Sequence, residues 1–168
     1  MSNLLVQNIK HTNGTTAQTV DSSGRVLEPV KPHILCDMNP SGSAGYVAVA
    51  NQGVFPFSNV LQNQGGFSVN TSTHKITVPC TGIYLMTINV LNETEQNIDV
   101  GFFVNDSHKL RFFVSTNRGL NASNTIQLSA NDEVHCRNTV SFSDEYYASG
   151  TNGLSDYAYQ TFSLTFLG

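Results

Sequence analysis

Histidine, cysteine and serine, the side chains that most often carry catalysis or bind zinc, are scattered along this 168-residue chain. None of the five histidines stands in a His-x-x-x-His or related spacing. His135 and Cys136 are neighbours on a predicted strand and therefore point to opposite faces, which disfavours a shared metal. The chain also lacks a Gly-x-Ser-x-Gly elbow and a glycine-rich phosphate loop ending in lysine. We therefore predict that this protein is not an enzyme.

Acidic residues in predicted turns are the candidate ligands for calcium, because calcium binds oxygen atoms. Their spacing matches no calcium-binding loop, so the alternative is that they are solvated turn residues. We predict no cofactor, with calcium left as an open possibility. The candidates are Asp99, Asp106, Asp132, Glu133, Asp144, Glu145 and Asp156.

A polar stretch from Asp144 to Tyr159 is rich in tyrosine, serine, glycine and asparagine. Binding loops favour this mixture, because tyrosine offers a large contact area at a small entropy cost. We predict a recognition loop here; the alternative is that the tyrosines pack under their own loop or between subunits. The polar segment Thr116–Asn124 is a second candidate loop. The predicted recognition residues are Tyr146, Tyr147, Tyr157 and Tyr159.

Composition excludes several classes of partner. The net charge is −4 and no basic run exists, which disfavours nucleic-acid binding. The odd count of cysteines (Cys36, Cys80 and Cys136) indicates buried free thiols, although one bridged pair stays open. No apolar run is long enough to predict membrane insertion, and the first residues lack the pattern of a secretory signal.

Alternating apolar and polar residues predict the strands that position these loops. Tyr84, Met86, Ile88 and Val90 share one face of a strand, and the same period of two recurs between turns along the chain. No helical period competes with it. The sequence therefore predicts an all-β sandwich, with Glu93–Asn97 as a polar connection between two strands.

Two predicted strands carry large apolar residues on both faces. Phe102 and Phe112 each lie on the strand face that also carries valines. Phe103 and Phe113 lie on the opposite face of the same strands. Each sheet of a monomeric sandwich has one wet face, so aromatic residues on that face need cover. We predict a subunit interface; the alternative is a loop that folds over them. The predicted interface residues are Ile83, Leu85, Phe103 and Phe113.

Residues 1–32 contain too few apolar side chains to hold a core of their own. Asp21 and Gly24 bound a turn, which predicts a small hairpin over Thr19–Leu27. We predict that this short extended tether packs on the domain of residues 33–168 or on another protein. The apolar residues available for attachment are Leu5, Val6, Ile9, Val20 and Val26.

Five short motifs follow one another in residues 33–168: Phe57-Ser58-Asn59-Val60, Ile76-Thr77-Val78-Pro79, Gly82-Ile83-Tyr84, Thr125-Ile126-Gln127-Leu128 and Thr161-Phe162-Ser163-Leu164. In this order they resemble the globular head of complement component one q, in the tumour-necrosis-factor-like superfamily. Asn131 departs from the glycine that is usual in the family. The resemblance implies a jelly-roll β-sandwich of about ten strands that forms a compact homotrimer.

Near the start of the chain, the stretch Asn8–Ala17 is followed by Asp21–Val26. These residues are similar to the opening of fibre-like virion proteins of tailed phages, notably those of marine bacteria. This resemblance implies a bacteriophage virion structural protein on the capsid or tail surface, attached to capsid or tail proteins through its N-terminal segment.

We therefore predict an outward-facing trimeric knob that binds host-surface glycans or proteins, or environmental ligands. The alternative is a capsid decoration protein that stabilises the shell. A secreted binding module of the complement-head type is a further alternative.

Overall fold

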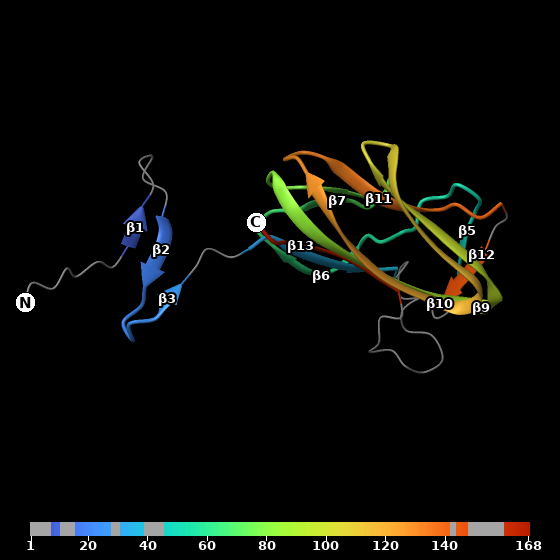
Figure 1. Cartoon of the computed structure of the whole chain (residues 1–168), viewed down its shortest axis with the longest axis horizontal. Coiled ribbons are helices and arrows are strands. Elements are labelled where there is room, and N and C mark those ends of the chain that lie inside the picture. The colour runs from blue at the N-terminus through green and yellow to red at the C-terminus, as the bar shows by residue number, and fades with distance from the viewer. Residues whose placement is uncertain (1–7, 11–15, 28–30, 39–45, 142–143, 148–159) are drawn as a thin grey trace, which may run out of the picture. The chain divides into compact units, whose positions relative to one another are not determined.

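The computed structural model describes residues 8–10, 16–27, 31–38, 46–141, 144–147 and 160–168 (Figure 1). The chain divides into two compact units, Met1–Lys31 and Pro32–Gly168.

The N-terminal unit contains a three-stranded antiparallel sheet in the order β1 (Asn8–Lys10), β2 (Thr16–Val20) and β3 (Val26–Leu27). Asp21 closes the turn between β2 and β3, because its Oδ1 accepts hydrogen bonds from the backbone N–H groups of Ser23 and Arg25, both at 2.9 Å. Gly24 follows in the left-handed region, with φ at 78°. None of the described hydrophobic side chains in this unit is fully buried.

The second unit, the head, is built from antiparallel strands, and its described residues contain no helix. The predicted all-β sandwich is confirmed. Its strands are β4 (His33–Asp37), β5 (Tyr46–Val49), β6 (Asn59–Gln64), β7 (Ser68–Asn70), β8 (Lys75–Thr77), β9 (Gly82–Val104), β10 (Ser107–Leu128), β11 (Glu133–Asn138), β12 (Asp144–Tyr147) and β13 (Thr161–Phe166).

The long strands β9 and β10 run side by side through both layers of the sandwich (Figure 1). The first half of β9 pairs with β13, and its second half pairs with β11. Asn105 and Asp106 form the tight turn between β9 and β10, with φ angles of 50° and 61°. Among the described strands β10 pairs with β9 alone, so β10 is an edge strand in both layers.

Glu93–Asn97 and Thr116–Asn124 lie within β9 and β10, so the prediction of loops in these two segments is wrong. The pairing continues through register shifts on either side of Asn117. Such bulges admit extra residues while the strands stay paired. A bond of 2.7 Å from the Arg118 guanidinium to the carbonyl of Glu93 holds the two bent segments together.

The core lies between the layers and uses the predicted face of β9. Tyr84, Met86, Ile88 and Val90 are all at most 2% exposed. Phe102, from the second half of β9, stacks on Phe162 of β13 with ring centroids 6.0 Å apart. This contact joins the two layers, since Phe162 is paired in register with Ile88 of the first half.

All three cysteines are free thiols. Burial and the neighbouring Asp37 raise the pKa of Cys36 to about 12, so this thiol stays protonated and unreactive at neutral pH.

Candidate functional site

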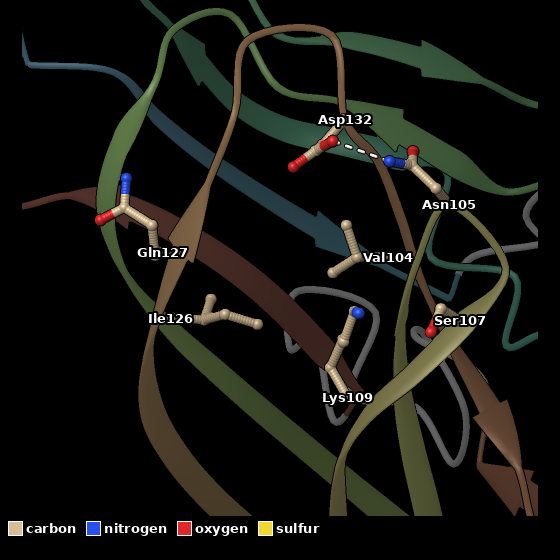
Figure 2. Close-up of a pocket in the computed structure, with 7 residues that line it drawn as sticks. All are labelled: Val104, Asn105, Ser107, Lys109, Ile126, Gln127 and Asp132. Carbon is tan, nitrogen blue, oxygen red and sulfur yellow. Dashed lines mark hydrogen bonds between the residues drawn. The ribbon is translucent and has the colours of Figure 1, made fainter.

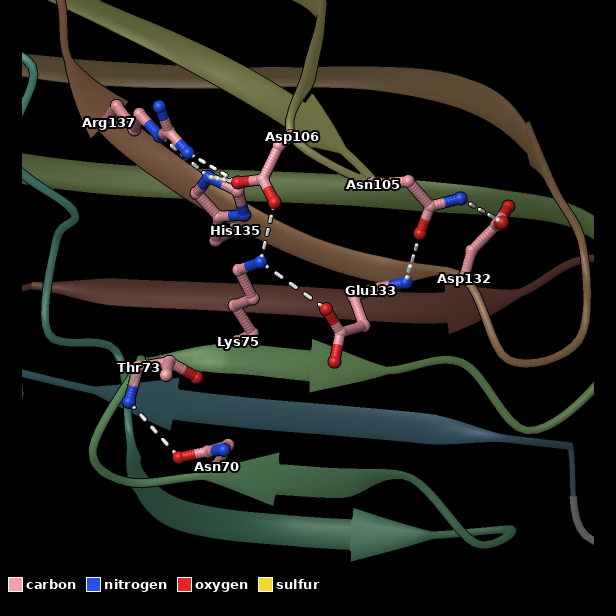
Figure 3. A network of polar contacts seen from close by, with 9 residues as sticks. All are labelled: Asn70, Thr73, Lys75, Asn105, Asp106, Asp132, Glu133, His135 and Arg137. Atoms are coloured by element: carbon pink, nitrogen blue, oxygen red, sulfur yellow. Dashed lines mark hydrogen bonds and ion pairs between the residues drawn. The ribbon is translucent and has the colours of Figure 1, made fainter.

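Asp106 is the centre of an ionic network at the end of the head where the β9–β10 turn lies (Figure 3). Lys75 Nζ of β8 donates to Asp106 Oδ2 at 2.8 Å and to Glu133 Oε2 at 3.3 Å. Arg137 of β11 donates to the other oxygen of Asp106. These bonds lower the pKa of Asp106 and raise that of Lys75. The network therefore fixes the turn to two other strands.

His135 lies beneath this network with a side chain that is 0% exposed. Arg137 Nε donates to His135 Nε2 at 2.8 Å, so the ring proton must be on Nδ1. Nδ1 has no hydrogen-bond partner among the described residues. Burial, and then the charge of Arg137, lower the pKa of His135 to about 4. The imidazole is therefore neutral at neutral pH.

A hollow of about 540 Å³ adjoins the network on the side of β10 (Figure 2). Val104 and Ile126 give it apolar walls, and Lys109 brings an ammonium group to its margin. Asn105, in the β9–β10 turn, and Asp132, just before β11, both line the hollow. Asn105 Nδ2 donates to Asp132 Oδ1 at 2.7 Å, so the hollow lies against these two turns. The full lining is Val104, Asn105, Ser107, Lys109, Ile126, Gln127 and Asp132.

Several of the candidate calcium ligands already have bonding partners within the head. Asp99 and Asp106 are bonded to arginine or lysine, and Asp132 accepts from Asn105 and from the backbone of Ser129. Within the described residues no group of three or more histidine, cysteine or acidic side chains could hold a metal. Asp156 and the side chain of Asp144 lie outside the described residues. The prediction of no cofactor, with calcium left open, stays a prediction.

The predicted interface residues do not form one patch. Ile83 is 46% exposed and Leu85 is partly exposed, on the outer face of the layer that contains β13. Phe113 lies on the outer face of the other layer, because its neighbours Phe112 and Val114 pack against the core. Its side chain is 53% exposed.

Phe103 is only 7% exposed, and its cover comes from its own subunit. His108 and His135 stack on the ring at centroid distances of 4.7 and 5.4 Å, and the guanidinium of Arg137 lies 4.5 Å from it. The cover comes from side chains of strands β10 and β11 and not from a loop. Phe103 is therefore buried without a neighbouring subunit, and its place in an interface stays a prediction.

Tyr146 is fully buried in β12 and meets Phe55 edge-to-face, with ring centroids 4.9 Å apart. The pairing of β12 with β5 turns Tyr146 into the core. This burial disfavours the predicted recognition role of Tyr146. Tyr147 is partly exposed, and its ring lies 4.9 Å from that of Tyr46. Tyr157 and Tyr159 lie outside the described residues.

Of the predicted attachment residues, Ile9 and Val26 are 51% and 58% exposed, and Val20 is partly exposed. Leu5 and Val6 lie outside the described residues. No helix in the described part of the chain is long and apolar enough to cross a membrane.

Arg111 and Arg137, which organise the polar surface of the head, were missed by reasoning from the sequence. Each pairs with a carboxylate on another strand or turn: Arg111 with Asp99, and Arg137 with Asp106. The available signal was the opposite charge of Asp99 and Arg111.

The model of the C1q domain family matches residues 43–163 of this chain. No curated protein matches the chain.

Three solved structures share the fold at low sequence identity. The tumour necrosis factor Eiger from S. frugiperda is 14% identical, with a TM-score of 0.66 over 83% of this chain and 94% of that one. Murine APRIL at pH 5.0 is 13% identical, with a TM-score of 0.57 over 82% and 100%. The globular domain of the zebrafish complement 1qA protein is 13% identical, with a TM-score of 0.56 over 83% and 98%. The sandwich is therefore the jelly roll of C1q and TNF domains, as the sequence resemblance implied.

Proposed function

The chain belongs to the C1q domain family, and we propose that it is a homotrimeric ligand-binding head on the surface of a bacteriophage virion. Domains of the C1q and TNF type are non-enzymatic binding modules that form homotrimers. Trimeric display raises avidity, because three weak contacts act together.

The uncovered edge along β10 carries the assembly part of this proposal. β10 is 22 residues long and has no partner strand on its outer side among the described residues. A long exposed edge favours uncontrolled pairing with other chains, and proteins usually cover it. The apolar side chains along this edge are only partly buried against the core: Leu110, Phe112, Val114, Ala122 and Ile126.

A second copy is the partner that best fits the β10 edge. The outer face of the β13 layer presents Ile83 and Leu85, and it is a different surface from the edge. When the edge of one subunit packs on the face of the next, the contact is heterologous, and such contacts form a closed ring when the rotation between subunits closes. In this arrangement the neighbour also covers the hollow beside Val104 and Ile126.

The N-terminal unit supports the attachment part of the proposal. Its opening residues are similar to those of phage fibre-like proteins, and its small sheet leaves Ile9 and Val26 exposed. A small sheet needs a hydrophobic face to be stable on its own, and the described apolar residues of this sheet are not buried. We assign the cover of these residues to a capsid or tail protein of the particle.

Immunogold labelling of purified virions tests the proposed location, and labelled particles are the expected result. Label on the tail places the knob there and favours host adhesion, whereas label spread over the shell favours a decoration role. Virions without label contradict the virion proposal. In particles that carry the variant Ile9→Asp with Val26→Asp we expect loss of the label, while Thr19→Asp alone serves as a control for charge.

A further inference from the structure

A second hollow, of about 290 Å³, lies on the outer face of the layer formed by β9, β10 and β11. It is separate from the ionic network at the turns. Its lining combines one aromatic ring with side chains that offer amide, carboxylate, guanidinium and hydroxyl groups. The lining residues are Asn97, Asp99, Arg111, Phe113, Thr139, Val140 and Ser141.

Phe113 provides an aromatic platform beside this hollow. The ring is 53% exposed, whereas the side chains before and after it, Phe112 and Val114, pack against the core. The fold of the subunit therefore does not need an aromatic residue at position 113. An aromatic ring next to a few side chains that donate and accept hydrogen bonds is the usual composition of a ligand site.

Arg111 is held in place beside this platform. Its Nε lies 2.9 and 3.0 Å from the two carboxylate oxygens of Asp99, and its guanidinium carbon lies 5.5 Å from the centre of the Phe113 ring. Asp99 is only 4% exposed and therefore gives the exposed Arg111 side chain a buried anchor. A guanidinium has five N–H groups, and those not directed at Asp99 remain as donors of fixed orientation.

We propose that this hollow binds one ring of a neutral saccharide, an assignment that rests on the proposed ligand-binding function and gives it a ligand class. The apolar C–H face of a sugar ring stacks on the exposed face of Phe113. Sugar hydroxyls accept hydrogen bonds from Arg111 and donate to the oxygens of Asn97 and Thr139.

The charge around the hollow and the size of the hollow both limit the class of ligand that it can bind. The positive charge of Arg111 is already offset by Asp99, so an anionic sugar gains no net attraction. The net charge of the chain, −4, also disfavours an acidic polysaccharide. The hollow lies at the small end of the range of ligand pockets, roughly 300–1,000 Å³, which suits a single ring.

Titration of the full-length protein with monovalent methyl glycosides tests the assignment without avidity. The probes are the methyl glycosides of glucose, galactose, mannose and N-acetylglucosamine, with methyl glucuronide as the acidic comparison. We expect at least one neutral glycoside to bind, and Phe113→Ala to weaken that binding by about tenfold or more. Phe113→Tyr keeps the ring and should retain affinity within about threefold.

Three results would overturn the saccharide site: no binding of any neutral glycoside, tighter binding of the glucuronide, or equal affinity of wild type and Phe113→Ala. A monomeric variant separates this question from assembly. Ile83→Asp should bind the monovalent glycoside as the wild type does, because Ile83 lies on the opposite face of the head. Retained glycoside binding by a monomeric wild type would refute the trimer and leave the saccharide site standing.

Discussion

The imidazole of His135 stacks on the ring of Phe103, with centroids 5.4 Å apart and planes inclined by 13°. Arg137 bonds to this imidazole and lies over the same phenyl ring, 4.5 Å from its centre. Gly101 makes room for the stack, because a Cβ at this position would lie 2.7 Å from the Phe103 ring. The outer face of the head is thus closed over Phe103 by groups of the same subunit.

Phe103→Ala should therefore affect the stability of the subunit and leave its assembly intact. We expect the free energy of unfolding to fall by about 3 kcal/mol, since the substitution removes a buried ring and leaves a gap between two imidazoles. Urea denaturation measures the loss, and light scattering checks the oligomeric mass. If the oligomer dissociated while the stability of the subunit stayed unchanged, Phe103 would be shown to lie in an intersubunit contact.

Burial of neutral His135 makes the stability of the head depend on pH. The pKa is lowered from 6.5 to about 4 in the folded state, first by burial and then by Arg137. Between these values the unfolded chain binds more protons, so stability is complete above pH 6.5 and falls as the pH falls toward 4. The loss should reach about 3 kcal/mol.

His135→Gln removes the titration of His135. Comparing this variant with the wild type separates the effect of His135 from that of the carboxylates, which also titrate in this range. The stability of the wild type should fall more steeply than that of the variant between pH 6.5 and 4. Equal slopes in urea denaturation at a series of pH values would show that His135 is not the group responsible.

The period of two was enough to predict which face of β9 forms the core, because Tyr84 and Met86 alternate with exposed or partly exposed residues. It could not predict the cover over Phe103. Arg137 and His135 come from another strand, and only the register that pairs His135 with Phe103 brings them together.

Local composition was a poor guide where tertiary pairing decides the structure. Thr116–Asn124 has the residues of a loop, yet β9 pairs with most of it through bulges. Tyr146 has the neighbours of a binding loop, yet the pairing of β12 with β5 places it in the core.

Tyr146→Ala should destabilise the head because Tyr146 is fully buried against Phe55. We expect a loss of about 3 kcal/mol or more in the free energy of unfolding. Tyr147→Ala, at the partly exposed neighbouring position, is the matched control and should cost about 1 kcal/mol. Chemical denaturation of both variants measures the difference, and a loss of ligand binding by Tyr146→Ala at full stability would contradict the core role.

Ile83→Asp should break the assembly without unfolding the subunit, because Ile83 is 46% exposed on the face that we assign to the neighbouring subunit. Phe113→Asp is the matched control on the opposite face, where 53% of the side chain is exposed. Sedimentation velocity should find smaller particles for the first variant and the wild-type size for the second. Smaller particles for Phe113→Asp and the wild-type size for Ile83→Asp would instead show that the interface lies on the Phe113 face.

The oligomeric mass of the full-length protein tests the central claim most directly. Native mass spectrometry at micromolar concentration should find three times the subunit mass of 18.3 kDa, because the β10 edge of each subunit is covered by the next. A single species of 18.3 kDa would contradict the trimeric head.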